Sequence, residues 1–131
     1  MKAALLAIGD EIVSGLTTDT NSGFLAEQLR AIGVEPVAGF SVPDDEDAIA
    51  RAFEGALAEA EVAISTGGLG PTRGDLTTGV VARLAGRPLR LDEPSLAIIE
   101  ERFRGRGMEL PENNRRQAVL PQGSTVVPNP L

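Results

Sequence analysis

Three short apolar runs, each followed by a polar loop and then a helical pattern, constrain the fold of this chain more than any other feature. The runs occupy residues 3–8, 34–42 and 62–65. The first, AALLAI, is continuously apolar rather than alternating, which is typical of a strand buried on both faces. Strands that alternate with helices predict βαβ units and a parallel sheet. We therefore predict an α/β fold, a three-layer α/β/α sandwich with a mostly parallel sheet.

Proline, glycine and capping residues indicate where the predicted strands and helices begin and end. The second strand contains Pro36 and Gly39, which favours a position near the edge of the sheet. Asp19 or Thr20 is predicted to cap the first helix, and a weak strand is predicted at Thr125–Val127. Helices are predicted over 21–33, 43–60, 76–84 and from Pro94 to 107, with Gly33 and Gly86 at two of the stops.

Composition excludes several classes of function. The 131 residues suit one domain, and the absence of Cys and His excludes thiolate nucleophiles, imidazole catalysis and His or Cys metal sites. A net charge of −7, with four Phe and no Tyr or Trp, argues against binding to nucleic acid. No apolar stretch approaches the roughly 20 residues of a membrane span, and no export signal is recognisable. We expect a cytoplasmic protein.

Three polar loops follow the three predicted strands. They are Gly9–Asp10–Glu11, Pro43–Asp44–Asp45 and the glycine-rich STGGLGPTRGD of residues 65–75. The carboxyl ends of parallel strands share one edge of a sheet, and ligands bind in the crevice outside that edge. We expect the three loops to converge there.

The glycine-rich loop leads into a predicted helix, whose N-terminus carries unpaired N–H donors and favours an anion such as phosphate. The loop lacks the lysine of a nucleotide-binding P-loop and matches no G-x-G-x-x-G pattern. Its neighbours Asp10, Asp44 and Asp75 would repel a phosphate unless a divalent cation neutralised both sides. Mg²⁺ takes one or two carboxylates together with phosphate oxygens and water. The residues therefore indicate a phosphate bridged by a metal ion.

Each of these acids also has a purely structural interpretation, and the residues alone leave both open. Asp75 could cap the following helix, and Gly9–Asp10–Glu11 could be a simple polar turn. Asp44 and Asp45 could complement a helix dipole, and Asp19–Thr20–Asn21 is ordinary capping material. The functional interpretation is favoured because all of them fall on one predicted edge.

Four motifs in order resemble those of the CinA family (competence/damage-inducible protein A), whose N-terminal domain belongs to the MoaB/MogA-like molybdopterin-binding superfamily. GGLGPTRGDLT is similar to the family signature G-G-L-G-P-T-x-D-D-x-T. The other three motifs are IGDEIVSGLTTDTN, VPDD and ENNRRQA.

The resemblance implies a MogA-like fold and metal-dependent hydrolysis of ADP-ribose to AMP and ribose 5-phosphate, with Mg, Mn or Co as the metal. It assigns Asp75 and Asp44 to catalysis and to the metal. The phosphate and substrate are assigned to Gly67, Gly68, Gly70, Thr72, Asp10, Glu11 and Asn21. Asn114 and Gln117 match the last motif. A small-molecule nucleotide or pterin phosphate is the expected partner, and a homo-oligomer is the expected assembly.

Two departures from the family pattern qualify these expectations. Gly74 stands where the signature has its first Asp, which removes one carboxylate and is expected to weaken hydrolysis. The alternative function is a molybdopterin- or nucleotide-binding module of the MogA/MoaB kind, either adenylyltransferase-like or catalytically silent. Family members continue beyond the position of Leu131, so residues 1–131 are expected to form the domain without its C-terminal strands and without the amidohydrolase domain.

Overall fold

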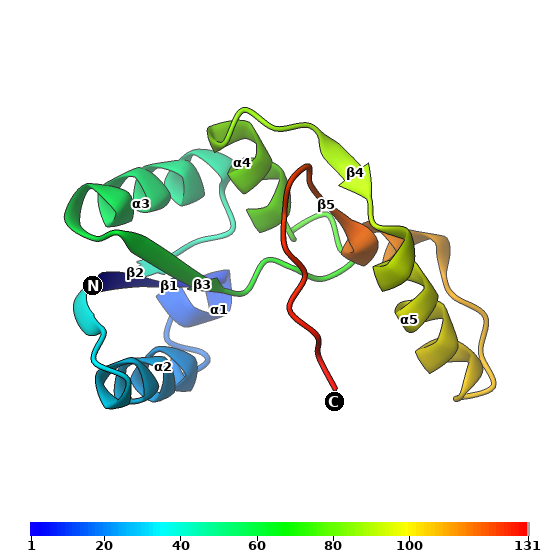
Figure 1. The fold of residues 1–131 in the computed structure, drawn as a ribbon, viewed down its shortest axis with the longest axis horizontal. Helices are drawn as coiled ribbons and strands as arrows, with labels where there is room; N and C mark the ends of the chain where they lie inside the picture. The colour runs from blue at the N-terminus through cyan, green and yellow to red at the C-terminus, as the bar shows by residue number, and fades with distance from the viewer. Residues whose placement is uncertain (131) are drawn as a thin grey trace.

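A three-stranded parallel sheet forms the centre of the protein in the computed structural model, which describes residues 1–130 (Figure 1). The strands β1 (Lys2–Ile8), β2 (Glu35–Val42) and β3 (Val62–Thr66) lie in the order β2-β1-β3. Residues 3–8 of β1 are at most 5% exposed, as expected for a central strand covered on both faces. β2 lies at an edge, so both predictions from the apolar runs are confirmed.

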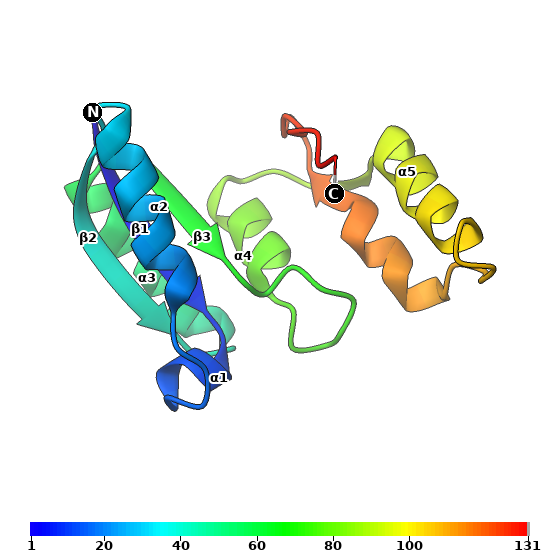
Figure 2. The same ribbon diagram turned by 90° about the horizontal axis from the view of Figure 1, so that it is seen from below.

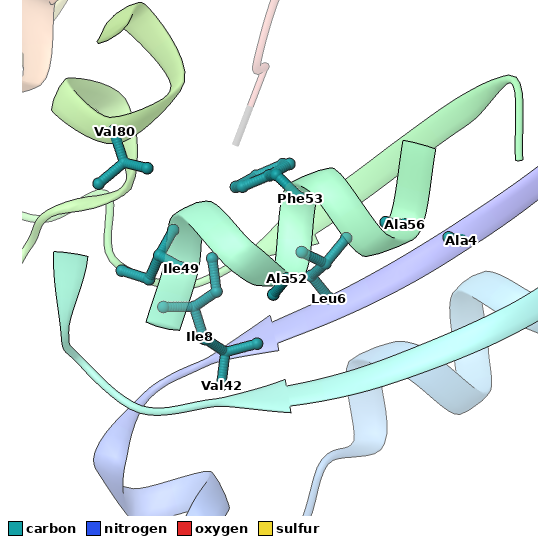
Figure 3. Close-up of a cluster of buried hydrophobic side chains, with 9 residues drawn as sticks. All are labelled: Ala4, Leu6, Ile8, Val42, Ile49, Ala52, Phe53, Ala56 and Val80. Atoms are coloured by element: carbon teal, nitrogen blue, oxygen red, sulfur yellow. The ribbon is translucent and has the colours of Figure 1, made fainter. Parts of the chain in front are cut away.

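Helices cover the two faces of this sheet and complete the three predicted layers. In Figure 1, α2 (Thr20–Ala31) lies below the sheet, and α3 (Glu46–Glu59) lies above it beside α4 (Thr77–Leu84). Figure 3 shows the main core on the α3 side. This cluster consists of Ala4, Leu6, Ile8, Val42, Ile49, Ala52, Phe53, Ala56 and Val80. The stripe along α3 is the one that the periodicity predicted, because residues three and four apart share a face of a helix.

Capping residues set the helix boundaries close to the predicted positions. Asp19 accepts a hydrogen bond from the N–H of Ser22 at the start of α2, and Asp45 accepts one from Ala48 at the start of α3. Gly33 and Gly86 follow the ends of α2 and α4 with φ of 81° and 63°. The structure adds a one-turn helix, α1 (Asp10–Val13), that the sequence did not predict. No helix among residues 1–130 is long and apolar enough to span a membrane.

The segment after α4 differs most from the prediction. It forms an arm of β4 (Leu89–Leu91), α5 (Glu93–Arg104), the 3₁₀ helix η1 (Glu112–Ala118) and β5 (Val119–Pro121). β4 and β5 pair antiparallel in a second, separate sheet. Figure 2 shows the arm beside the glycine-rich loop, away from the main sheet. Only α5 was predicted, because strands of three residues are too short to show a periodic pattern.

The strand predicted at Thr125–Val127 is wrong. These residues adopt no regular structure and are exposed. Their β-branched side chains suit a strand, but a strand also needs a partner. Within residues 1–130, no neighbouring strand pairs with them.

The outer edge of β3 predicts self-association. Within residues 1–130, β3 pairs with β1 alone, and its five residues are only half-buried. An unpaired apolar edge of this kind templates strand addition, and a lysine on it opposes pairing. We expect residues 1–131 to form dimers or larger species that Ile64→Lys shifts toward monomer, as measured by light scattering after size exclusion. Leu57→Lys, at an exposed position on α3, is the control. Equal masses for the two variants would contradict a role for this edge.

Candidate functional site

The loops after β1 and β2 are joined by reciprocal hydrogen bonds. The N–H of Asp10 donates to Asp44 Oδ2 at 3.1 Å, and the N–H of Asp44 donates to Asp10 Oδ1 at 2.9 Å. The N–H of Gly9 also donates to Val42 O at 2.8 Å. The predicted convergence of these loops at the carboxyl edge of the sheet is confirmed. Each carboxylate anchors the other loop.

The glycine turn after β3 packs directly on the end of β1. Gly67 and Gly68 have φ of 90° and 67°, in the left-handed region that favours glycine. A Cβ at Gly67 would lie 2.0 Å from Ile8 O, and one at Gly68 would lie 2.1 Å from Thr77 Oγ1. Thr77 also donates from Oγ1 to Gly67 O and from its N–H to Gly68 O. Both glycines are therefore required by backbone conformation and by close packing.

Asp75 braces the glycine-rich loop from within. Its Oδ2 accepts hydrogen bonds from Thr72 Oγ1 at 2.7 Å and from the N–H of Thr72 at 2.8 Å. α4 begins two residues later, with Leu76 as its N-cap and no side-chain capping bond, so Asp75 is not a helix cap.

The pKa of Asp75 lies below its ordinary value. The largest cause is the hydrogen bond from Thr72 Oγ1, and partial desolvation opposes the shift. The N–H groups of Thr72 and Gly70 and the positive charge of Arg116 lower the pKa further. Asp75 is therefore ionised at neutral pH, as a cation ligand must be.

A pocket of about 340 Å³ lies between the glycine-rich loop and the arm. The loop contributes Gly68, Gly70 and Asp75 to its polar side. Leu76 also lines the pocket, whose other residues are Glu46, Leu69, Thr78, Gly79, Leu89, Arg116, Gln117, Val119 and Leu120. We call this cavity the Asp75 pocket. It combines two glycines and a carboxylate of the loop with an apolar wall from β4 and β5.

A second pocket, of about 180 Å³, lies on the β1 side of the glycine turn. Three of its lining residues, Glu11, Asn21 and Gly67, were predicted to bind substrate. Its remaining polar lining comes from Thr17, Thr18, Asp19, Thr20 and Thr66. We call it the threonine pocket. Gly67 lines this pocket and Gly68 lines the other, so the glycine turn separates the two.

The predicted site residues thus fall into three groups. Gly68, Gly70 and Asp75 line one pocket, and Glu11, Asn21 and Gly67 line the other. Asp10 and Asp44 bond to each other, and Thr72 bonds to Asp75. Asp44 is not among the residues that line the Asp75 pocket, whereas Glu46 is. Among residues 1–130, no group of three or more Asp and Glu residues is close enough to hold a metal ion. The pairing of Asp44 with Asp75 around a metal remains a prediction.

Sequence reasoning missed Arg116, which reaches the glycine-rich loop from η1. Its guanidinium donates to the carbonyl oxygens of Thr72 at 2.6 Å and Asp75 at 3.3 Å. Asn114 and Gln117, the residues singled out in ENNRRQA, bond to each other through Nδ2 and Oε1 at 3.2 Å. The motif itself was the available signal. It directed attention to its two amides rather than to Arg116, the second of the two arginines between them.

The comparisons with known proteins agree with this fold. Residues 4–128 match the family described as "Probable molybdopterin binding domain". The chain belongs to that family, as an α/β domain with the MoaB/MogA-like fold, and its relatives within the family are CinA-like proteins.

Two curated relatives and two solved structures illustrate the similarity. The chain is 39% identical over 130 residues to a putative competence-damage inducible protein of Alkaliphilus oremlandii, covering 99% of this chain and 32% of that protein. It is 44% identical to a CinA-like protein of Citrifermentans bemidjiense, covering 100% of this chain and 32% of the relative. The chain therefore spans about a third of the length of these relatives.

The structure of CinA from Thermoplasma acidophilum, a protein of unknown function, has a TM-score of 0.89 and 35% identity, covering 99% of this chain and 76% of that one. MoaB from Pyrococcus furiosus, a tungsten cofactor synthesizing protein, has a TM-score of 0.60 and 31% identity. The match covers 63% of this chain and 52% of the MoaB chain.

Proposed function

We propose that this domain hydrolyses the pyrophosphate bond of a nucleotide in a reaction that needs a divalent metal. ADP-ribose is the proposed substrate, and AMP and ribose 5-phosphate are the proposed products. The observation that carries the proposal is the Asp75 pocket. It brings an ionised carboxylate and two glycines of the loop together with apolar side chains of β4 and β5.

The donor set suits a magnesium-like cation held partly by its substrate. Asp75 offers one carboxylate, and the pocket lacks the cluster of acids that a protein-enclosed metal needs. Mg²⁺ and Mn²⁺ sites that act on phosphates take one or two carboxylates and fill their remaining positions with phosphate oxygens and water. A cation bound there would neutralise charge on the pyrophosphate and lower the pKa of a bound water. With no His in the chain, a carboxylate or a metal-bound hydroxide has to serve as the base.

The chain's own groups would orient the two ends of the substrate. The Leu89, Val119 and Leu120 wall offers apolar area to a nucleoside base. On the other side of the glycine turn, the threonine pocket offers hydroxyl, amide and carboxylate groups that suit the hydroxyls of a sugar. A substrate with two ends and a central pyrophosphate matches two pockets with a glycine turn between them.

Product formation tests the proposal directly. We expect the purified chain to release AMP and ribose 5-phosphate from ADP-ribose when Mg²⁺, Mn²⁺ or Co²⁺ is present, and to release neither in chelator. Chromatography of the nucleotides detects both the loss of substrate and the appearance of AMP. The absence of AMP with all three metals would refute hydrolysis of this substrate.

A second function is favoured by Gly74, which removes a carboxylate found in the family signature. Under this second function, the domain is a binding module for a pterin or nucleotide phosphate and has no catalytic activity. Calorimetry with ADP-ribose separates the two functions, because a module binds the compound without releasing AMP.

Restoring the family acid tests whether position 74 belongs to the site. Gly74 is not among the glycines with positive φ, and a Cβ there would meet only Thr72 Oγ1, at 3.8 Å. Aspartate therefore fits without backbone strain, on the side of the hydroxyl that bonds Asp75. We expect Gly74→Asp to raise ADP-ribose hydrolysis about tenfold at millimolar Mn²⁺, because a second carboxylate binds the cation or orients its water.

The same variant is expected to bind substrate more weakly when metal is scarce. Two negative charges about 4 Å apart repel by on the order of 4 kcal/mol at an effective dielectric of about 20. Titration of activity against Mn²⁺ for wild type and variant measures both effects. Gly23→Asp on α2, where a Cβ meets nothing within 4 Å, controls for added surface charge. Superimposable curves for wild type and Gly74→Asp would place position 74 away from the metal.

A further inference from the structure

One arginine of the arm holds both ends of a turn in the glycine-rich loop. Arg116 Nη1 donates to Thr72 O at 2.6 Å and to Pro71 O at 3.4 Å, while Nη2 donates to Asp75 O at 3.3 Å. Arg116 is more than 40 residues from these partners along the chain. A rigid planar fork with several donors can bridge separated acceptors in a way that a single ammonium group cannot.

The inner side of the same turn is closed by Asp75. Its Oδ2 accepts from the N–H and the Oγ1 of Thr72, and its own N–H donates to Thr72 O at 3.2 Å. Thr72 is thus held from inside by the Asp75 carboxylate and from outside by the Arg116 guanidinium. The Asp75 contact lies within the loop and does not connect the turn to the arm. Arg116 supplies that connection, because η1 packs on α5 and β5.

The hydrogen bonds from Arg116 to the carbonyls of Pro71 and Thr72 determine where the following N–H groups point. In a planar trans peptide, the C=O and the following N–H point in opposite directions. Because the carbonyls of Pro71 and Thr72 face Arg116, the N–H groups of Thr72 and Arg73 face away from it. The N–H of Thr72 accordingly meets Asp75 Oδ2. Arg116 therefore sets the orientation of the peptide groups after Pro71 and Thr72, including the N–H that holds the Asp75 carboxylate.

We propose that Arg116 is a positioning residue, through which the arm holds the glycine-rich loop and the Asp75 carboxylate in the arrangement that forms the pocket. Its effect on the loop is independent of any activity. Its consequence for catalysis rests on the proposed hydrolase function. With Arg116 removed, three carbonyls lose the bond from its guanidinium and the turn loses this link to the arm.

Amide hydrogen exchange on the chain of residues 1–131 tests the positioning role without any ligand. We expect Arg116→Gln to accelerate exchange in residues 68–75 about tenfold or more, while the amides of β1 keep their wild-type rates. Arg116→Lys keeps the charge but can reach fewer carbonyls. Its exchange rates in residues 68–75 should lie between those of wild type and Arg116→Gln. Unchanged exchange in residues 68–75 overturns the proposal. So does equal acceleration in the loop and in β1, because that is global destabilisation.

Arg115→Gln is the matched control. Arg115 is the preceding residue of η1, pairs with Glu112 across 3.7 Å, and lines a different pocket from Arg116. This variant loses an arginine from the same helix without touching the loop. We expect its loop exchange to equal that of wild type. Acceleration as large as in Arg116→Gln would show that the charge of η1, rather than the contact with the loop, is what matters.

Kinetics with ADP-ribose and Mn²⁺ separate positioning from direct binding of substrate. A misplaced loop should lower kcat by about 10-fold to 100-fold with a smaller change in KM, and Arg116→Lys should recover part of the loss. A rise in KM alone, with normal loop exchange, would mean that Arg116 binds the substrate and would overturn the positioning role. If wild type has no turnover, the hydrolase function fails while the exchange result still decides the role of Arg116.

Discussion

Replacement of Asp75 by asparagine is expected to lower the turnover of ADP-ribose by about 10³-fold and leave the fold intact. Asparagine keeps an oxygen that can accept from Thr72 Oγ1 and the N–H of Thr72, so the brace seen in the structure can survive. What the substitution removes is the negative charge, and with it the anionic ligand for a cation. A 10³-fold loss corresponds to about 4 kcal/mol of transition-state stabilisation.

Asp75→Ala and Thr72→Val divide this effect into its two parts. Alanine removes both the charge and the brace, so it should be at least as inactive as asparagine. Thr72→Val removes only the Oγ1 donor and should cost activity far less. Asp47→Asn, an exposed acid in the first turn of α3, controls for an amide substitution on the surface. The free energy of unfolding of Asp75→Asn, measured by thermal denaturation, should differ from that of wild type by no more than about 1 kcal/mol. Full activity of Asp75→Asn with added metal would remove Asp75 from the mechanism.

Local patterns were sufficient for the main sheet and its helices. A continuous apolar run predicted the central strand β1, and proline and glycine predicted that β2 lies at an edge. Both are properties of a few adjacent residues, which single-sequence patterns report well. The convergence of the loops followed from one topological rule, since the carboxyl ends of parallel strands share an edge. The Asp10–Asp44 bonds confirm it.

The arm and the details of the loop could not be obtained in this way. β4 and β5 have three residues each, and they are strands because they pair with each other. Thr125–Val127 has a stronger strand composition but finds no partner within residues 1–130. The contacts of Arg116 join positions more than 40 residues apart. Tertiary pairing decides all three cases, and local composition carries little information about it.

The structural role of Asp75 is compatible with the functional role proposed for it. The sequence offered helix capping or metal binding, and the structure shows a third arrangement, a brace within the loop. A braced carboxylate has a fixed orientation, and the hydrogen bond from Thr72 Oγ1 lowers its pKa, so it stays ionised further into the acid range. The brace therefore adds to the case for function, because preorganised charge does not have to be ordered when a ligand binds.

Gly67→Ala is expected to destabilise the domain more than any other single substitution in the glycine-rich loop. Alanine at a φ of 90° pays the left-handed penalty of about 1–2 kcal/mol. Its Cβ would also lie 2.0 Å from Ile8 O, the last carbonyl of the buried central strand. Backbone on both sides leaves no flexible side chain to move aside, so overpacking adds about 1–3 kcal/mol. Together these predict a loss of about 3 kcal/mol and a fall in Tm of about 10 °C.

Gly33→Ala isolates the contribution of the clash. Gly33 has nearly the same φ, 81°, but a Cβ there would meet nothing within 4 Å. It should therefore lose only the conformational part, about 1–2 kcal/mol. Urea unfolding of the two variants beside wild type gives the difference between their losses of unfolding free energy, which is the cost of the clash with Ile8 O. A larger loss for Gly67→Ala means that this close approach sets the position of the turn between the two pockets. Equal losses would mean that the loop can move off Ile8, and the separation of the pockets would then be adjustable rather than built into the sheet.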